Sequence, residues 1–404
     1  MAPAPMITSA ATADKVVHEI RRKQRADGPA TVLGIGTANP ETCMSQDEYP
    51  DYYFRVTNSE HFPHLKDRLK RICKKSGIEK RFMYVLNDEV LEAHPEFTDR
   101  NLPSLDARVE ITSKAVPELA AAAATKAIAD WGRPATDITH LIFSTYSAVK
   151  APSGDRYLAS LLGLRPTVSR TVLSLHGCYG GGRALQLAKE LAENNRGARV
   201  LVACAEMTLI AFYGPEEGAD DTMIGHALFG DGSGAVIVGA DPDDAVERPL
   251  FEMAFASQTT VPNTEHLITM QHNMGGMDYH VGSGVPEIIG SNIEQCLVDA
   301  FDSIAVKAKW NDLFWAVHPG GRRILDVIQE VLGLGDGALA ASRKVLREFG
   351  NMSGTTVVFV LSELRRRFEA NGVEGGEWGA LMAFGPGVTV ETILLRIASG
   401  LKKN

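Results

Sequence analysis

Cys178 is the residue of this chain that is best placed to act as a nucleophile. It lies in the glycine-rich segment LSLHGCYGGG, residues 173–182. The run from Arg170 to Leu175 predicts a buried strand, and the run from Arg183 to Asn194 predicts an amphipathic helix. The glycines permit a tight turn that places the sulfur at the helix N-terminus, beside unpaired N–H groups. The helix dipole lowers the pKa of a thiol there, so we expect a reactive thiolate.

A buried structural cysteine is the alternative, because free cysteines usually pack as small hydrophobes. The chain has five cysteines: Cys43, Cys73, Cys178, Cys204 and Cys296. Cys204 lies in the apolar run 201–205, which predicts a core strand. No two cysteines form a C-x-x-C pair, so we expect no zinc site. The small odd number is typical of a protein from a reducing compartment.

The composition is that of a soluble globular protein. The 404 residues are 45% hydrophobic and 23% charged, which suits two large domains or one duplicated fold. The net charge of −9 argues against a dedicated nucleic-acid binder. No apolar run approaches the ~18 residues of a membrane span. Met1 to Asp14 lacks the features of a signal peptide, so we expect a loose arm and a cytoplasmic protein.

The alternation of predicted strands and helices indicates an α/β fold, and an internal repeat divides it. At an offset of 173 residues, Gly177, Gly181, Glu190 and Leu191 match Gly350, Gly354, Glu363 and Leu364. The same offset pairs the predicted strand 141–145 with 314–318. A second match pairs FGDG at 229–232 with FGPG at 384–387. We therefore predict two similar halves, residues 1–248 and 249–404, whose equivalent turns meet around Cys178.

His318 and Asn351 lie at such turns in the second half. His318 ends an apolar strand and precedes Pro-Gly-Gly, and Asn351 follows Gly350 at a strand-to-helix turn. Each by itself is equally well explained as a turn residue. A cysteine and a histidine can form a thiolate–imidazolium pair, whereas a histidine with an asparagine can donate hydrogen bonds to an oxyanion or an enolate. The residues alone leave both arrangements open.

From about Ala30 to Ile397 the chain resembles the plant type III polyketide synthases, the chalcone and stilbene synthase family of the thiolase superfamily. The motifs are GC at 177–178, ALFGDG at 227–232, VHPGG at 317–321, GNMS at 350–353 and FGPG at 384–387. The resemblance implies a thiolase-like fold with two duplicated α/β halves in αβαβα layers. It implies that Cys178 accepts an acyl group from a CoA starter. His318 and Asn351 would then bind malonyl-CoA and stabilise the enolate left by decarboxylation.

The resemblance also implies the surroundings of this triad. Phe229 falls on the family's gatekeeper phenylalanine, and Tyr279 replaces the second one. The CoA-phosphate cations fall on Arg68, Arg71 and Lys75, which spacings of three and four place on one face of a predicted helix, 66–75. The alternative for these cations is a solvated basic face. The family implies a homodimer, acyl-CoA and malonyl-CoA as substrates, no resident cofactor or metal, and no acyl carrier protein.

The residues at which this sequence differs from the chalcone synthases include positions that line the family's substrate pocket. Tyr146 and Ala211 replace threonines, Met270 replaces a glycine, and Ser353 is retained. Because these changes add and remove volume, we expect a narrow slot rather than a uniformly larger cavity. A long fatty acyl starter would gain roughly 0.8 kcal/mol per buried methylene in such a slot.

We therefore expect three malonyl extensions and an aldol closure to an alkylresorcylic acid or alkylresorcinol. A hydrogen-bonded set of Ser353, Tyr146 and Glu206 would resemble the family's aldol network. The alternative is an aromatic starter with a chalcone, stilbene, pyrone or curcuminoid-type product. A thiolase, a fatty-acid ketosynthase and a non-catalytic paralogue are the competitors outside this class.

Overall fold

The computed structural model describes residues 10–218, 220–372 and 376–402. Its main sheet has nine strands in the order β11-β12-β13-β8-β1-β7-β6-β4-β5. The first half supplies β1 (Thr31–Ala38), β4 (His140–Thr145), β5 (Ser169–Ser174), β6 (Arg199–Glu206) and β7 (Gly232–Gly239). The second half supplies β8 (Phe251–Thr260), β11 (Phe314–Val317), β12 (Trp378–Gly385) and β13 (Thr389–Ile397).

The strand pairing repeats between the halves. In the first half β4 is parallel to β6, β6 is antiparallel to β7, and β7 is antiparallel to β1. In the second half β11 is parallel to β12, β12 is antiparallel to β13, and β13 is antiparallel to β8. The strands 141–145 and 314–318 that the repeat matched are therefore equivalent in topology. The antiparallel pair β1 and β8 joins the two halves.

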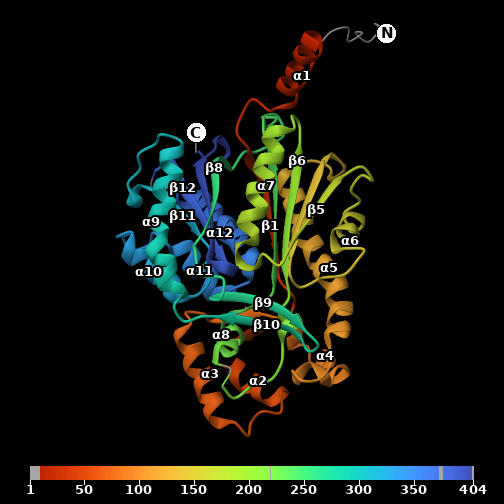
Figure 1. Cartoon of the computed structure of the whole chain (residues 1–404), viewed down its shortest axis with the longest axis vertical. Coiled ribbons are helices and arrows are strands. Elements are labelled where there is room, and N and C mark those ends of the chain that lie inside the picture. The colour runs from red at the N-terminus through yellow and green to blue at the C-terminus, as the bar shows by residue number, and fades with distance from the viewer. Residues whose placement is uncertain (1–9, 219, 373–375, 403–404) are drawn as a thin grey trace.

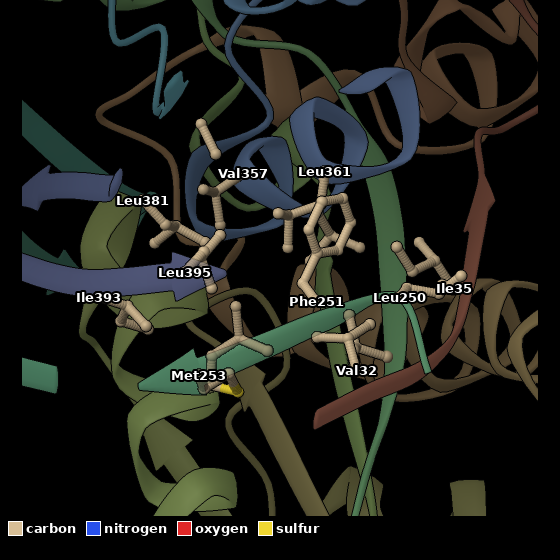
Figure 2. Packing of buried hydrophobic residues seen from close by; sticks show 14 of the residues in the cluster. Val32, Ile35, Leu250, Phe251, Met253, Val357, Leu361, Leu381, Ile393 and Leu395 are labelled. Atoms are coloured by element: carbon tan, nitrogen blue, oxygen red, sulfur yellow. The ribbon is translucent and has the colours of Figure 1, made fainter. Parts of the chain in front are cut away.

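Two helices lie between the halves and share one core. They are α7 (Gly180–Asn194) and α12 (Thr356–Asn371), and their apolar residues pack with strands of both halves. Figure 2 shows Val357 and Leu361 of α12 above Val32 of β1, Phe251 of β8 and Leu395 of β13. This common core makes α7 and α12 the central layer.

The outer faces of the sheet are covered separately. On the first half, α5 (Leu105–Trp131) and α6 (Gly154–Leu161) pack against β1, β4, β6 and β7. On the second, α9 (Val285–Ser303) and α10 (Arg322–Val331) cover the strands β11 to β13, with α11 (Ala340–Phe349) beside them. Helix, sheet, helix, sheet, helix is the αβαβα order of a thiolase-like fold (Figure 1).

A smaller group of elements closes one end of these layers (Figure 1). It comprises α2 (Tyr49–Val56), α3 (Pro63–Lys75), α4 (Asp88–Ala93), α8 (Asp220–Leu228), the pair β2 (Cys43–Ser45) and β3 (Lys80–Phe82), and the hairpin β9 (Ile268–Asn273) with β10 (Gly276–Val281). Aromatic residues of α2, with Leu69 of α3 and Phe212, form its core. This end carries the predicted gate and the basic helix.

Two expectations about local structure need correction. The strand before Cys178 is not buried, because β5 is the edge strand of the sheet and its residues are partly or fully exposed. The expected arm is helical where it is described, since α1 (Ala10–Gln24) includes Ala10 to Asp14. Met1 to Ser9 lie outside the described residues. Within the described ranges no helix is long and apolar enough to cross a membrane.

Candidate active site

Cys178 occupies a 3-10 turn, η4 (Gly177–Tyr179), that leads directly into α7. Gly177 has φ +56°, and a Cβ there would lie 2.9 Å from Cδ of Pro386. Both the left-handed backbone and the close approach of Pro386 therefore require glycine. The predicted geometry of the turn is confirmed: the thiol stands at the N-terminus of the central helix.

Three polar atoms surround the sulfur. Sγ of Cys178 lies 3.6 Å from Oγ of Ser353 and 3.9 Å and 4.0 Å from Oδ1 and Nδ2 of Asn351. Cys178 and Asn351 occupy equivalent positions of the two halves, so the internal repeat brings its own matched residues into contact. The turn η7 (Ser353–Thr355) leads into α12 as η4 leads into α7.

The electrostatics of Cys178 differ from the expectation. Burial raises the pKa of the thiol to about 11, although hydrogen bonds from Ser353 and Asn351 oppose this change and the carboxyl of Glu206 adds to it. The expectation of a lowered pKa is therefore wrong for the unliganded chain, because desolvation of the thiolate outweighs the polar groups around it. With this pKa the side chain of Cys178 is a thiol at neutral pH.

His318 follows β11 and is buried, with 1% of its surface exposed. Its main-chain N–H donates to the carbonyl of Met382 at 2.8 Å, which fixes the residue at the end of the strand. Neither ring nitrogen has a hydrogen-bond partner among the described residues. Burial lowers the pKa of the imidazole to about 3, so the ring is neutral. A neutral ring with free nitrogens favours hydrogen-bond donation to a substrate oxygen over a thiolate–imidazolium pair.

Hydrogen bonds fix both the main chain and the side-chain amide of Asn351. Nδ2 donates to the carbonyl of Gly320 at 3.1 Å, and Oδ1 accepts from the N–H of Ser353 at 2.8 Å. Its main-chain N–H donates to Leu228, and its carbonyl accepts from Gly230. These two bonds flank Phe229, which also forms a β-bridge with Asn351. The predicted gate residue and the amide are thus fixed to one another.

The gate and pocket residues pack against one another beside a small cavity. The rings of Phe229 and Tyr279 lie 5.1 Å apart, and Tyr279 meets Tyr146 edge to face at 6.1 Å. Met270 faces Tyr279 across the β9–β10 hairpin. The cavity measures about 10 Å³, and its lining residues are Met83, Thr208, Ala211, Phe212, Gly225, His226, Phe229 and Tyr279. Tyr146, Met270 and the triad do not line it.

The expected set of Ser353, Tyr146 and Glu206 does not form as a side-chain network. Glu206 accepts hydrogen bonds from the hydroxyls of Thr145 at 3.2 Å and Ser147 at 2.6 Å, and from the main-chain N–H of Tyr146. Ser353 instead directs its hydroxyl at the sulfur of Cys178. The Tyr146 side chain is absent from the bonds of Glu206, because it packs in a buried cluster with Ala211 and Met277 and meets Tyr279 edge to face. Burial raises the pKa of Glu206 to about 8.

The three predicted CoA cations lie on α3, as the helical spacing predicts. Arg68 is half-buried, and Arg71 and Lys75 are exposed. The neighbouring Lys66 and Lys70 both bond Asp51, at 2.8 Å and 2.9 Å. The described residues contain no group of three or more His, Cys, Asp or Glu side chains that could hold a metal ion.

Arg81 is a functional residue that the sequence reasoning missed. It is 1% exposed, stacks on Tyr49 at 4.1 Å, and donates to the carbonyls of His226 at 2.8 Å and Phe229 at 2.6 Å. Its Nε donates to Gln46 at 2.8 Å. The cation therefore holds the C-terminal carbonyls of α8 and fixes the gate. An arginine beside Lys80 looks like a surface residue, so the sequence carried no signal for this role.

Comparisons with known proteins identify the family of this chain. Residues 17–242 match the model of the N-terminal domain of chalcone and stilbene synthases, and residues 252–399 match the model of the C-terminal domain. Bisdemethoxycurcumin synthase from Oryza sativa subsp. japonica is 55% identical over 387 residues, covering 94% of this chain and 96% of that protein. The chain belongs to the chalcone and stilbene synthase family and is a type III polyketide synthase, an acyltransferase that uses CoA thioesters.

Proposed function

We propose that this polyketide synthase takes an aromatic acyl-CoA starter and makes a curcuminoid-type product, a linear diarylheptanoid. The observation that carries the proposal is the 55% identity to a bisdemethoxycurcumin synthase, over 94% of this chain and 96% of that protein. Glu206 bonds the hydroxyls of Thr145 and Ser147, while Ser353 bonds Cys178, and this arrangement supports a product that forms without an aldol closure.

The chemistry of the first extension follows from the triad. The Cys178 thiol gives its proton to solvent, and the thiolate attacks the carbonyl carbon of the starter thioester. The carbon–sulfur bond to CoA breaks, and the CoA thiolate takes up a proton from solvent and leaves as the thiol. Neutral His318 and the second N–H of Asn351 donate to the thioester oxygen of malonyl-CoA, so the charge left when CO₂ departs is held on that oxygen. The enolate carbon then attacks the acyl carbon on Cys178. The carbon–sulfur bond breaks, the thiolate is restored, and a β-ketoacyl-CoA is formed.

A diarylheptanoid requires a second acyl group and no further malonyl unit. Water hydrolyses the β-ketoacyl-CoA to a β-keto acid and CoA. The β-keto acid loses CO₂, and its carbanion attacks a second acyl group on Cys178. Two acyl-CoA, one malonyl-CoA and one water thus give one diarylheptanoid, three CoA and two CO₂. No aldol ring closure is needed, which fits the absence of a Ser353–Tyr146–Glu206 set.

A long fatty acyl starter, with three extensions and closure to an alkylresorcylic acid or alkylresorcinol, is the second candidate. It is favoured by the position of Ala211, whose small side chain lines the cavity wall next to Met83 and Phe212. A flexible Met270 suits an irregular apolar chain. The two candidates differ in starter and in the number of malonyl units consumed.

Two further features belong to the proposal. Arg71 and Lys75 on α3 would bind the CoA phosphates, since α3 packs beside α8, the helix that precedes Phe229. Replacing both with Gln should raise KM for every CoA substrate and leave kcat within twofold.

A second copy of the chain would cover the edge strand β5, near which Val149, Leu161 and Leu175 are more than two-fifths exposed. Sedimentation equilibrium tests this: a monomer at micromolar concentration would contradict it.

One incubation series decides between the candidates. p-Coumaroyl-, cinnamoyl-, hexanoyl-, palmitoyl- and stearoyl-CoA are each supplied with isotope-labelled malonyl-CoA, and products are identified by mass. The proposal expects the aromatic starters to have the highest kcat/KM and the diarylheptanoid to retain one malonyl carbon. Alkylresorcinols from palmitoyl-CoA at a higher kcat/KM would replace it with the second candidate. Release of a chalcone or stilbene would contradict both.

A further inference from the structure

The cavity wall contains a hydroxyl group whose hydrogen has no acceptor. The Tyr279 oxygen is fully buried and donates no hydrogen bond to any described residue, and the phenol of Tyr146 is a polar group that interacts with it. A buried hydroxyl that donates no hydrogen bond is unfavourable, so native proteins rarely keep one unless something else accepts from it.

Tyr279 lies beside the predicted gate. Its ring lies against the gate residue Phe229 at 5.1 Å and lines the same cavity as Ala211. Strand β10 fixes the backbone through its pairing with Met270 on β9. Burial raises the pKa of the phenol well above its ordinary value, so the group stays protonated and can donate a hydrogen bond.

We propose that the Tyr279 hydroxyl donates a hydrogen bond to the β-keto oxygen of the β-ketoacyl-CoA as this thioester passes Phe229. A starter acyl chain carries no oxygen at its β carbon, so the bond forms only after the first condensation. It holds the β-ketoacyl group at the gate and selects it over an unextended acyl group. The inference rests on the proposed function in one respect, that the β-ketoacyl-CoA passes Phe229, but not on whether the starter is aromatic or fatty.

Acetoacetyl-CoA and butyryl-CoA test the proposal, because they differ only in the β-keto oxygen. Binding is measured by calorimetry in the full chain carrying Cys178→Ala, which prevents acyl transfer. We expect acetoacetyl-CoA to bind about three- to tenfold more tightly than butyryl-CoA, the range for one neutral hydrogen bond. Tyr279→Phe should remove this preference, to within twofold, and leave the affinity for butyryl-CoA unchanged.

Tyr49→Phe is the matched control. Tyr49 is also buried and its hydroxyl hydrogen also has no acceptor among the described residues, but it lies in α2 and does not line the cavity. This variant should keep the preference for acetoacetyl-CoA. A purely structural effect of losing a buried phenol would appear in both variants and would contradict the proposal.

Variants of two other residues with hydroxyl groups give results that would contradict the proposal. Thr208 lines the same cavity and carries a hydroxyl that interacts with Asp231, and Tyr146 packs against Tyr279. If Thr208→Val or Tyr146→Phe removes the acetoacetyl preference while Tyr279→Phe keeps it, the donor is misassigned. If only p-coumaroyl and not cinnamoyl thioesters respond to Tyr279→Phe, the hydroxyl binds the starter phenol and the proposal fails. Neither result depends on which starter the enzyme prefers in turnover.

Discussion

Gly181 of α7 and Gly354 of η7 touch across the interface between the two halves. A Cβ on Gly181 would lie 2.0 Å from the carbonyl oxygen of Gly354, and a Cβ on Gly354 would lie 2.9 Å from the N–H nitrogen of Gly181. The two glycines are equivalent in the internal repeat. Their contact sets how closely the two catalytic turns approach, and the distances around the Cys178 sulfur depend on it.

Gly181→Ala should therefore separate the halves at the site. The new methyl group meets backbone rather than a flexible side chain, so we expect a loss of about 3 kcal/mol or more in the free energy of unfolding. Gly284→Ala is the control, since a Cβ there has no atom within 4 Å and its φ is −81°. Thermal unfolding and soluble yield measure both. Equal melting temperatures for the two variants would contradict the close contact.

The reactivity of Cys178 should depend on pH in the direction that its raised pKa sets. With a pKa of about 11, the thiolate fraction of the free enzyme increases about tenfold per pH unit from pH 8 to 10. Iodoacetamide labelling, followed at Cys178 by peptide mass, should rise without a plateau over this range. A plateau below pH 9 would show that the pKa of the Cys178 thiol is not raised.

Ser353→Ala should slow that labelling. The hydroxyl lies 3.6 Å from the sulfur and opposes the rise in the thiol pKa. Its loss removes a hydrogen bond to the thiolate, and we expect a three- to tenfold lower labelling rate at pH 8. Ser353→Thr keeps the hydroxyl and should retain most of the rate. An unchanged rate in the alanine variant would mean that the contact does not act on the thiolate.

Glu206 should make stability depend on pH between about 4.5 and 8. Burial raises its pKa to about 8, so the folded chain holds this proton more tightly than the unfolded chain does. The contribution of Glu206 is therefore fully present below about pH 4.5 and is lost as pH rises to 8, at up to about 1.4 kcal/mol per pH unit. Glu206→Gln cannot ionise. Urea unfolding at pH 5.5 and 8 should show a smaller decline for the variant than for the parent chain.

Ala211 tests the long-chain candidate directly. Its side chain lines the cavity, so Ala211→Thr adds atoms where a chain passing toward Met83 would lie. If fatty starters use this path, the variant should lose palmitoyl-CoA turnover about tenfold or more and keep hexanoyl-CoA turnover within twofold. Equal effects on both chain lengths would exclude the path.

Lysine at position 81 should not preserve the stability and activity that Arg81 supports. Its planar guanidinium group donates hydrogen bonds to Gln46, His226 and Phe229 at once. The ammonium group of a lysine cannot reproduce that geometry. We expect Arg81→Lys to lower the melting temperature and to reduce kcat/KM about tenfold for both CoA substrates. Arg248→Lys, at an exposed site, is the control. Parental kinetics in Arg81→Lys would show that the gate does not need these bonds.

The sequence predicted the backbone of the site better than its environment. The offset of 173 residues was sufficient to place Cys178 beside Asn351, because glycine turns and strand ends repeat at visible positions. The high pKa of Cys178, the partners of Glu206 and the burial of Arg81 depend on what other segments pack around each group. Spacing along the chain carries no information about that packing. The exposure of β5 was missed for the same reason, since an edge strand has the same apolar composition as a buried one.

The equivalence of Cys178 and Asn351 has a consequence for how such a centre can arise. Two identical subunits joined by an exact dyad would carry the same side chain at both turns. With both turns encoded in one chain, each is free to change independently. In the mechanism that we propose, one turn carries the group that forms a covalent bond, and the other, within 4 Å of it, carries a group that binds charge. A pseudosymmetric scaffold thereby supports an asymmetric reaction.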